Sequence, residues 1–167
     1  MSVTGVVSVA SALAAVVAVA LSIRQARLMS RQSLLPVVLE AFREARSPEW
    51  FEARDFIYER LAAEFPPDLG VSQQPPQARA ALRKVGFLFD NFGLLIAHGV
   101  VPEELVTGFF GSLDEFWHIM EPYIRKEAEL REMDYMVFFE DLVVRSQSRS
   151  AMDIRESLGL RTTIVGY

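Results

Sequence analysis

Residues 77–98 read QARAALRKVGFLFDNFGLLIAH, and this stretch decides the fold class. Its apolar residues recur every three or four positions, which is the spacing of a buried stripe on an α-helix. The stripe consists of Ala78, Leu82, Val85, Phe89, Phe92 and Ile96. Pro75-Pro76 close the loop before it, and Gly99 suits the position just after a helix C-terminus. We therefore predict one long helix over this stretch.

Helix signals continue on both sides of this stretch. Ser47-Pro48-Glu49 combine a cap, a proline in the first turn and an acid at the positive end of the helix dipole. Further helix starts are predicted at Pro102-Glu103-Glu104, at Ser112 and at Tyr135. Because Pro122 lacks a backbone donor, we predict a kink or restart there, after a helix from Leu113 to Ile119. No segment keeps a period of two, so we predict an all-α fold without a sheet.

The N-terminal segment Val3–Ile23 is 21 residues long and carries no charge. As a helix it would span roughly 31 Å, close to the hydrocarbon thickness of a bilayer. It could also be a signal peptide cleaved after Ala18-Val19-Ala20, but the basic residues that precede such a segment are missing. We favour a retained transmembrane helix followed by a small helical bundle.

The positive charges that flank the apolar segment predict its orientation. Arg24, Arg27 and Arg31 follow it, and no Lys or Arg precedes it. The positive-inside rule then places the N-terminus outside and the body in the cytoplasm, at the plasma (inner) membrane. The three arginines could also contact lipid head groups.

The predicted parts of the chain are an anchor (1–23), a juxtamembrane helix (24–46), a bundle (47–146) and a polar tail (147–167). The tail is predicted to be irregular except for a short helix ending at Gly159.

Small residues recur every four positions in the apolar segment. They are Ala10, Ala14, Ala18 and Ser22. Such a row lets helix backbones approach closely in lipid and can drive association with another copy or with a partner protein. An Ala-rich segment also shows such rows by chance, and both interpretations stay open.

Composition excludes several classes of function. The net charge of −5 and the pI of about 5.1 argue against nucleic-acid binding, which needs a basic surface. The chain has no cysteine, so disulfides, thiol nucleophiles and Cys-ligated metals are excluded. The sequence contains no catalytic or cofactor-binding motif, and we predict neither a catalytic residue nor a cofactor.

Two histidines are the only imidazole candidates. Glu115 and His118 have the Glu-x-x-His spacing of di-iron bundles, but those bundles need a second such pair, and Leu95 stands where its Glu would precede His98. We therefore predict no metal site, and an enzyme built on His118 is the weakest hypothesis.

The acidic residues of the C-terminal third are interpreted as a face exposed to solvent. They are Glu121, Glu127, Glu129, Glu132, Glu140 and Asp141.

Asp90 and Asn91 interrupt the apolar stretch, and a polar residue buried there needs a hydrogen-bond partner. We favour a structural interpretation, in which they cap or bridge neighbouring helices. The alternative is a polar contact site for a partner or ligand, formed by Asp90, Asn91 and His98.

Residues 90–105 read DNFGLLIAHGVVPEEL, and they are followed by Trp117, by Pro122-Tyr123-Ile124 and by residues 135–142. In these segments the sequence resembles a bacterial family of short, membrane-anchored helical proteins catalogued as a domain of unknown function. In that family a Glu typically stands at the position of Gly93, and an Asp stands near that of Pro102. The resemblance implies the same anchored, helical architecture and no established activity.

Together these observations favour a non-enzymatic, membrane-tethered interaction protein, an accessory subunit or adaptor of a membrane complex. The alternative is a membrane-bound sensor or regulator that takes up a ligand in its helical domain.

Overall fold

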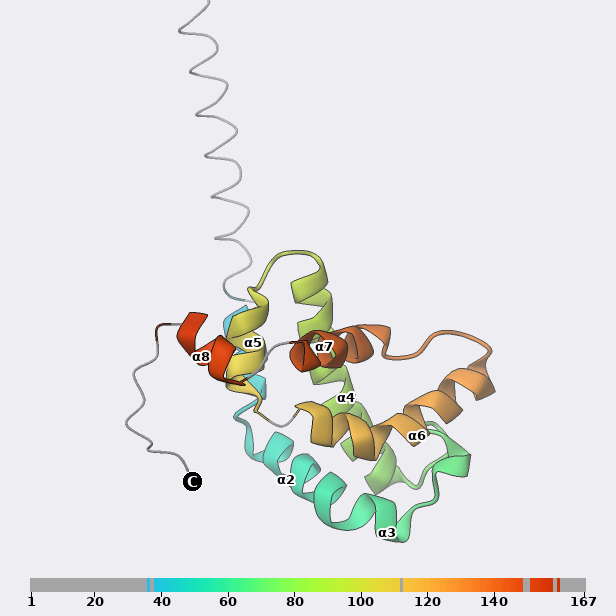
Figure 1. Cartoon of the computed structure of the whole chain (residues 1–167). Coiled ribbons are helices and arrows are strands. Elements are labelled where there is room, and N and C mark those ends of the chain that lie inside the picture. The colour runs from blue at the N-terminus through green and yellow to red at the C-terminus, as the bar shows by residue number, and fades with distance from the viewer. Residues whose placement is uncertain (1–35, 37, 112, 149–150, 158, 160–167) are drawn as a thin grey trace, which may run out of the picture. The chain divides into compact units, whose positions relative to one another are not determined.

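The computed structural model describes residues 36, 38–111, 113–148, 151–157 and 159 (Figure 1). The chain divides into two compact units, Met1–Leu39 and Glu40–Tyr167, and every helix from α2 onward belongs to the second unit. Within the described residues every regular element is a helix, so the all-α prediction is confirmed. No helix within that part of the chain is long and apolar enough to cross a bilayer. The predicted anchor Val3–Ile23 lies outside the described residues.

After a helical stretch at residues 40–44, the elements follow in order as α2 (Pro48–Phe56), η1 (Ile57–Leu61, a π-helix), α3 (Ala62–Glu64), η2 (Pro67–Leu69, a 3₁₀-helix), α4 (Pro76–Ala97), α5 (Glu103–Phe109), α6 (Leu113–Arg131), α7 (Val137–Gln147) and α8 (Ala151–Ser157).

The helix starts predicted at Ser47 and Pro102 are found there, whereas α7 begins at Val137 and not at the predicted Tyr135, and Ser112 lies outside the described residues. The Ser47 hydroxyl accepts a hydrogen bond from the backbone N–H of Trp50 at 3.1 Å, so it caps α2. The central helix α4 begins at Pro76 and ends at Ala97, and Gly99 follows with a φ of +65°. Pro102 is the cap of α5. Local capping chemistry therefore determines these boundaries.

Aromatic side chains fill the core around α4. Phe89 and Phe92 of α4 are fully buried, and the Phe89 ring stacks on that of Phe139 from α7, with ring centroids 4.9 Å apart. Trp50 of α2 and Phe110 lie against the same Phe89 ring. Burial of large rings is the main stabilising contribution to a bundle of this size. Helix α4 thus joins α2 and α7 into one core.

The predicted helix end at Ile119 and the restart at Pro122 are wrong, because α6 is continuous from Leu113 to Arg131 with Pro122 inside it. Both Pro122 and His118 are exposed, so the carbonyl of His118 that loses its helical donor faces solvent. On the opposite face the buried stripe of Phe116, Met120 and Tyr123 runs across the proline. Packing on that face holds the helix together.

Residues before the predicted boundary at residue 47 also pack on the bundle. The Phe42 ring packs against those of Phe92 and Phe109, at centroid distances of 5.0 and 4.9 Å, and Ala45 is buried. At the other end, the segment 147–167 predicted as a tail contains α8, whose Ile154 is buried. Gly159 follows α8 with a φ of +63°.

The connection between α3 and α4 is irregular in backbone, and side chains hold it on several sides. The Tyr123 hydroxyl of α6 donates to the carbonyl of Phe65 at 2.6 Å. The buried Gln74 amide donates to the carbonyl of Pro66 at 2.7 Å. Side chains thereby satisfy the backbone carbonyls of Phe65 and Pro66, which no helix satisfies.

Candidate functional site

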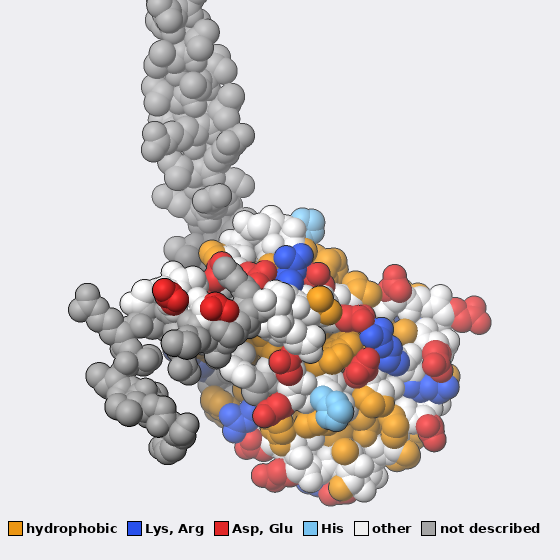
Figure 2. All heavy atoms as spheres, viewed as in Figure 1, with side chains coloured by type: hydrophobic (Ala, Val, Ile, Leu, Met, Phe, Trp, Pro, Cys, Tyr) orange, Lys and Arg blue, Asp and Glu red, His pale blue; other side chains and the backbone are white. Residues whose placement is uncertain are grey.

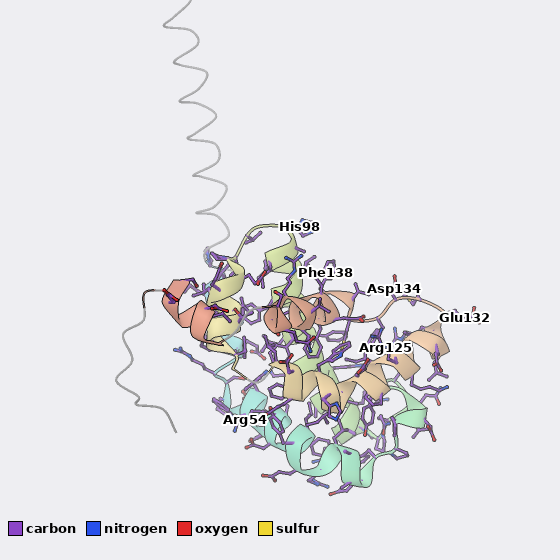
Figure 3. The ribbon with its side chains drawn as sticks, in the orientation of Figure 1. Arg54, His98, Arg125, Glu132, Asp134 and Phe138 are labelled. Atoms are coloured by element: carbon purple, nitrogen blue, oxygen red, sulfur yellow. The ribbon has the colours of Figure 1, made fainter. Side chains whose placement is uncertain are left out.

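The structure separates the three residues of the predicted polar contact site. The Asp90 carboxylate faces α7, where it accepts hydrogen bonds from the backbone N–H groups of Phe138 and Phe139 at 3.0 and 3.1 Å. Asn91 and His98 are exposed on α4 and its C-terminal cap, and Figure 3 shows His98 at the end of the helix. The three residues do not converge on one site.

Asp90 acts as the N-terminal cap of α7, supplied from another helix. The residue at the cap position itself, Met136, has a left-handed φ of 54° and makes no side-chain cap hydrogen bond. Burial raises the pKa of Asp90, although the hydrogen bonds from Phe139 and Phe138 oppose that shift. The structural interpretation of Asp90 thus fits its contacts.

Gly93 allows α7 to approach α4 closely enough for this cap. A Cβ at position 93 would lie 2.0 Å from the backbone oxygen of Phe138, which is far inside van der Waals contact. Glycine is therefore required here by the approach of another backbone. A larger side chain would not fit this arrangement.

Glu127 of α6 is a second buried carboxylate, and its interpretation as part of a solvated face is wrong. Its side chain is 0% exposed. It accepts hydrogen bonds from the backbone N–H groups of Val71 and Ser72, each at 2.8 Å, and pairs with Arg131. Burial alone would raise the pKa of Glu127, but the hydrogen bonds from Ser72, Arg131 and Val71 outweigh it and lower the pKa.

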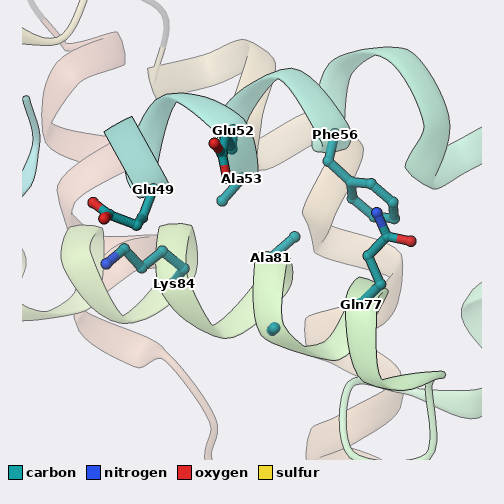
Figure 4. A pocket seen from close by; sticks show the side chains of 8 residues that line it. Glu49, Glu52, Ala53, Phe56, Gln77, Ala81 and Lys84 are labelled. Atoms are coloured by element: carbon teal, nitrogen blue, oxygen red, sulfur yellow. The ribbon is translucent and has the colours of Figure 1, made fainter. Parts of the chain in front are cut away.

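An open recess between α2 and α4 is the clearest candidate for binding (Figure 4). It has a volume of about 290 Å³, and its lining residues are Glu49, Glu52, Ala53, Phe56, Gln77, Ala80, Ala81 and Lys84. In Figure 4 the two helices run antiparallel, with Glu49 beside Lys84 and Phe56 beside Gln77. The recess depends on how two helices pack, so no pattern in the sequence alone predicts it.

A second recess of about 370 Å³ adjoins the first. Its lining residues are Glu44, Ala80, Arg83, Lys84, Phe87, Leu88 and Asn91. Because Ala80 and Lys84 line both recesses, we treat them as one surface and call it the α4 groove. Asn91 of the predicted contact site lies at one end of it. The signal in the sequence was the pair of small residues Ala80 and Ala81 on a helix otherwise rich in large side chains.

The charges along the α4 groove are unevenly paired. Lys84 forms an ion pair with Glu44, whereas Glu49 and Glu52 are exposed and have no ion-pair partner among the described residues. Over the face viewed in Figure 2, acidic, basic and hydrophobic side chains are interspersed. The two unpaired carboxylates make the α2 edge of the groove acidic.

His118 lies exposed on α6. Glu115, one turn before it, accepts a hydrogen bond from the Tyr58 hydroxyl at 3.2 Å. In the part of the chain that the structure describes, no group of three or more His, Cys, Asp or Glu residues is placed to hold a metal ion. The remaining predicted positions, Ala10, Ala14, Ala18, Ser22, Arg24, Arg27 and Arg31, lie outside the described residues.

Comparison with curated proteins and with solved structures gave no match. A family model does match the chain over residues 8–146, from within the N-terminal apolar segment to the last turn of α7. This match covers most of the chain. The protein therefore belongs to the family described as "Domain of unknown function (DUF4760)".

Proposed function

We propose that this protein is a non-enzymatic, membrane-tethered interaction protein, an accessory subunit or adaptor that holds a partner protein at the membrane. The observation that carries this proposal is the α4 groove, an elongated surface with an apolar floor and two unpaired carboxylates at its edge. An open groove of this kind suits a segment of another protein better than a small molecule, whose sites are usually more enclosed.

The tether is proposed from the apolar segment Val3–Ile23. The family model begins at residue 8 and so includes most of that segment. This supports its retention in the mature protein, because a cleaved signal peptide is not part of the mature domain. The arginines at positions 24, 27 and 31 then favour a cytoplasmic body at the inner membrane.

The alternative function, a ligand sensor built on Asp90, Asn91 and His98, has less support. A ligand site needs polar groups that converge on one pocket. The Asp90 carboxylate accepts two backbone hydrogen bonds from α7, and His98 is exposed. We therefore do not assign these residues to a ligand.

Purification of the full chain from its own membrane in mild detergent tests this proposal. We expect a stoichiometric partner protein, identified by mass spectrometry of the species that co-elute. A chain without residues 1–23 serves as the control for the tether and should no longer sediment with membranes. Recovery of the chain as a lone monomer or homo-oligomer, with no partner after crosslinking, would overturn the adaptor function.

A further inference from the structure

We propose that the α4 groove binds an amphipathic helix of the partner protein, with small or aliphatic side chains on its floor and Lys or Arg beside Glu49 and Glu52. This inference rests on the proposed function, since it names the surface and the partner chemistry of the interaction.

The shape of the groove suits a helix. The positions of α4 that line it are Gln77, Ala80, Ala81, Arg83, Lys84, Phe87, Leu88 and Asn91. They recur at intervals of three or four residues, which places them on one side of the helix. From residue 77 to residue 91 this face is about 21 Å long, or about four helical turns. A partner helix of similar length can lie along it, as amphipathic helices do in hydrophobic grooves.

The floor of the groove allows close approach. Ala80 and Ala81 of α4 and Ala53 of α2 are its small residues, and small residues let another helix backbone come near. At the far end Phe87 is 44% exposed, and it lines the second recess. An exposed aromatic beside a floor of small residues provides an apolar contact for a partner side chain.

The acidic edge specifies the charge of the partner. Glu49 lies in the first turn of α2, where the helix dipole already favours a carboxylate. Glu52 lies one turn further on, where the helix dipole no longer favours a carboxylate. Neither Glu49 nor Glu52 has an ion-pair partner among the described side chains. On the α4 side of the groove Lys84 pairs with Glu44 and Arg83 adds a second positive charge, whereas the α2 edge carries only the two unpaired carboxylates. A complementary helix carries basic residues there.

A photocrosslinking amino acid placed at Ala80, in the full chain and in its own membrane, tests the proposal directly. Position 129 on α6, where Glu129 is exposed, is the control. We expect a crosslink from position 80 to a segment of another protein with Lys or Arg at helical spacing. A crosslink to a lipid, to a second copy of the chain or to a segment without basic residues would overturn the proposal, as would no crosslink at all.

Charge reversal at the edge completes the test. We expect Glu49→Lys with Glu52→Lys to reduce the crosslink from position 80 at least about tenfold, because like charges then face each other. Glu59→Lys with Glu129→Lys changes the net charge equally at exposed positions outside the groove, and should leave the crosslink unchanged. Glu49→Gln with Glu52→Gln, checked for an unchanged circular dichroism spectrum, should give a partial loss without repulsion.

The decisive result is restoration of the crosslink when the basic residues of the partner are changed to Glu in the presence of the two lysines. If the reversals have no effect, the charge assignment is wrong. Capture of a partner from position 129 but not from position 80 would end this inference while the adaptor function stands. No partner from either position, together with a chain that purifies alone, would end both.

Discussion

Asp90 and Glu127 each accept hydrogen bonds from two consecutive backbone N–H groups of a segment about 50 residues away in the chain. Asp90 holds the first turn of α7, and Glu127 holds the irregular connection before α4. Each site also depends on a glycine, Gly93 beside Asp90 and Gly70 beside Glu127, where a Cβ would collide with the structure. The two sites differ in one partner, since only Glu127 pairs with an arginine.

The larger set of hydrogen-bond donors at Glu127, which includes Ser72, Arg131 and Val71, accounts for the opposite pKa shifts. Burial penalises both carboxylates, but at Glu127 the guanidinium of Arg131 adds to the backbone donors and the pKa falls. At Asp90 the backbone donors alone do not offset burial, and the pKa rises. A buried carboxylate is therefore held in its charged form most effectively where a cation shares it.

The largest expected effect is at Glu127. Glu127→Gln keeps the shape and can keep the acceptor oxygen for Val71 and Ser72, but it removes the charge that Arg131 needs and turns an NH2 group toward the Arg131 donor. We expect the free energy of unfolding to fall by about 3 kcal/mol, measured by urea denaturation of the full chain in detergent. Glu129→Gln, at an exposed position of the same helix, should leave the midpoint unchanged. An equally small effect of both changes would remove the distinction between the two carboxylate sites.

Gly93→Ala is the next most disruptive change. Its Cβ meets the backbone oxygen of Phe138 at 2.0 Å, so α7 must move away from α4 and from the Asp90 carboxylate. We expect a loss of about 2 kcal/mol in unfolding free energy. Gly111→Ala, where a Cβ has open space, is the control. A full-stability Gly93→Ala variant would show that the α4–α7 contact is looser than described.

Substitution of Asp90 should cost less than substitution of Glu127. Asp90→Ala leaves two backbone N–H groups of α7 without their acceptor, for an expected loss of about 1 kcal/mol. Asp90→Asn retains an acceptor oxygen and removes a charge that burial disfavours, so it should cost less than Asp90→Ala. The same denaturation experiment measures both. If Asn costs as much as Ala, the acceptor oxygen at position 90 does not hold the first turn of α7.

The smallest expected effects are those of pH, and they have opposite signs. The pKa of Glu127 lies below its ordinary value of 4.5, so its contribution to stability is present above 4.5 and is lost as the pH falls through the folded-state pKa. The pKa of Asp90 lies above its ordinary value of 3.8, so its contribution is complete below 3.8 and is lost as the pH rises through the folded-state pKa.

Urea midpoints between about pH 3 and about pH 6 measure these contributions against the amide variants. With rising pH, the stability of the natural chain relative to Glu127→Gln should increase, and its stability relative to Asp90→Asn should decrease. If both stability differences changed with pH in the same direction, the larger set of donors at Glu127, Arg131 included, would not be the cause of the opposite pKa shifts of Glu127 and Asp90.

Most helix boundaries could be predicted, because Ser47, Gly99 and Pro102 act on the residues next to them. Pro122 could not be interpreted in this way, since packing on the opposite face of α6 overrides the missing donor. Because the helix was predicted to end before Pro122, the burial of Glu127 was not predicted either. Its position continues the buried stripe of Met120 and Tyr123 at helical spacing, but only if the helix is extended through the proline.

The site was less predictable than the fold. The sequence indicated that Asp90 needs a partner, but α7 begins 47 residues later, and no local pattern shows which backbone it caps. The α4 groove depends on the packing of α2 and residues 40–44 beside α4, which small residues such as Ala80 only suggest. Contacts of this kind follow from tertiary arrangement, which one sequence does not display.

The connection at residues 65–75 also limits how this protein can be cut or extended. It is irregular and rich in proline, which in most proteins marks a segment open to proteases and tolerant of insertions. Here Glu127, Tyr123 and Gln74 occupy its backbone polar groups, so a protease would have to release those contacts before the chain could enter its active site. A tag or an inserted domain at this point would separate α6 from the start of α4, and reporters are better placed elsewhere.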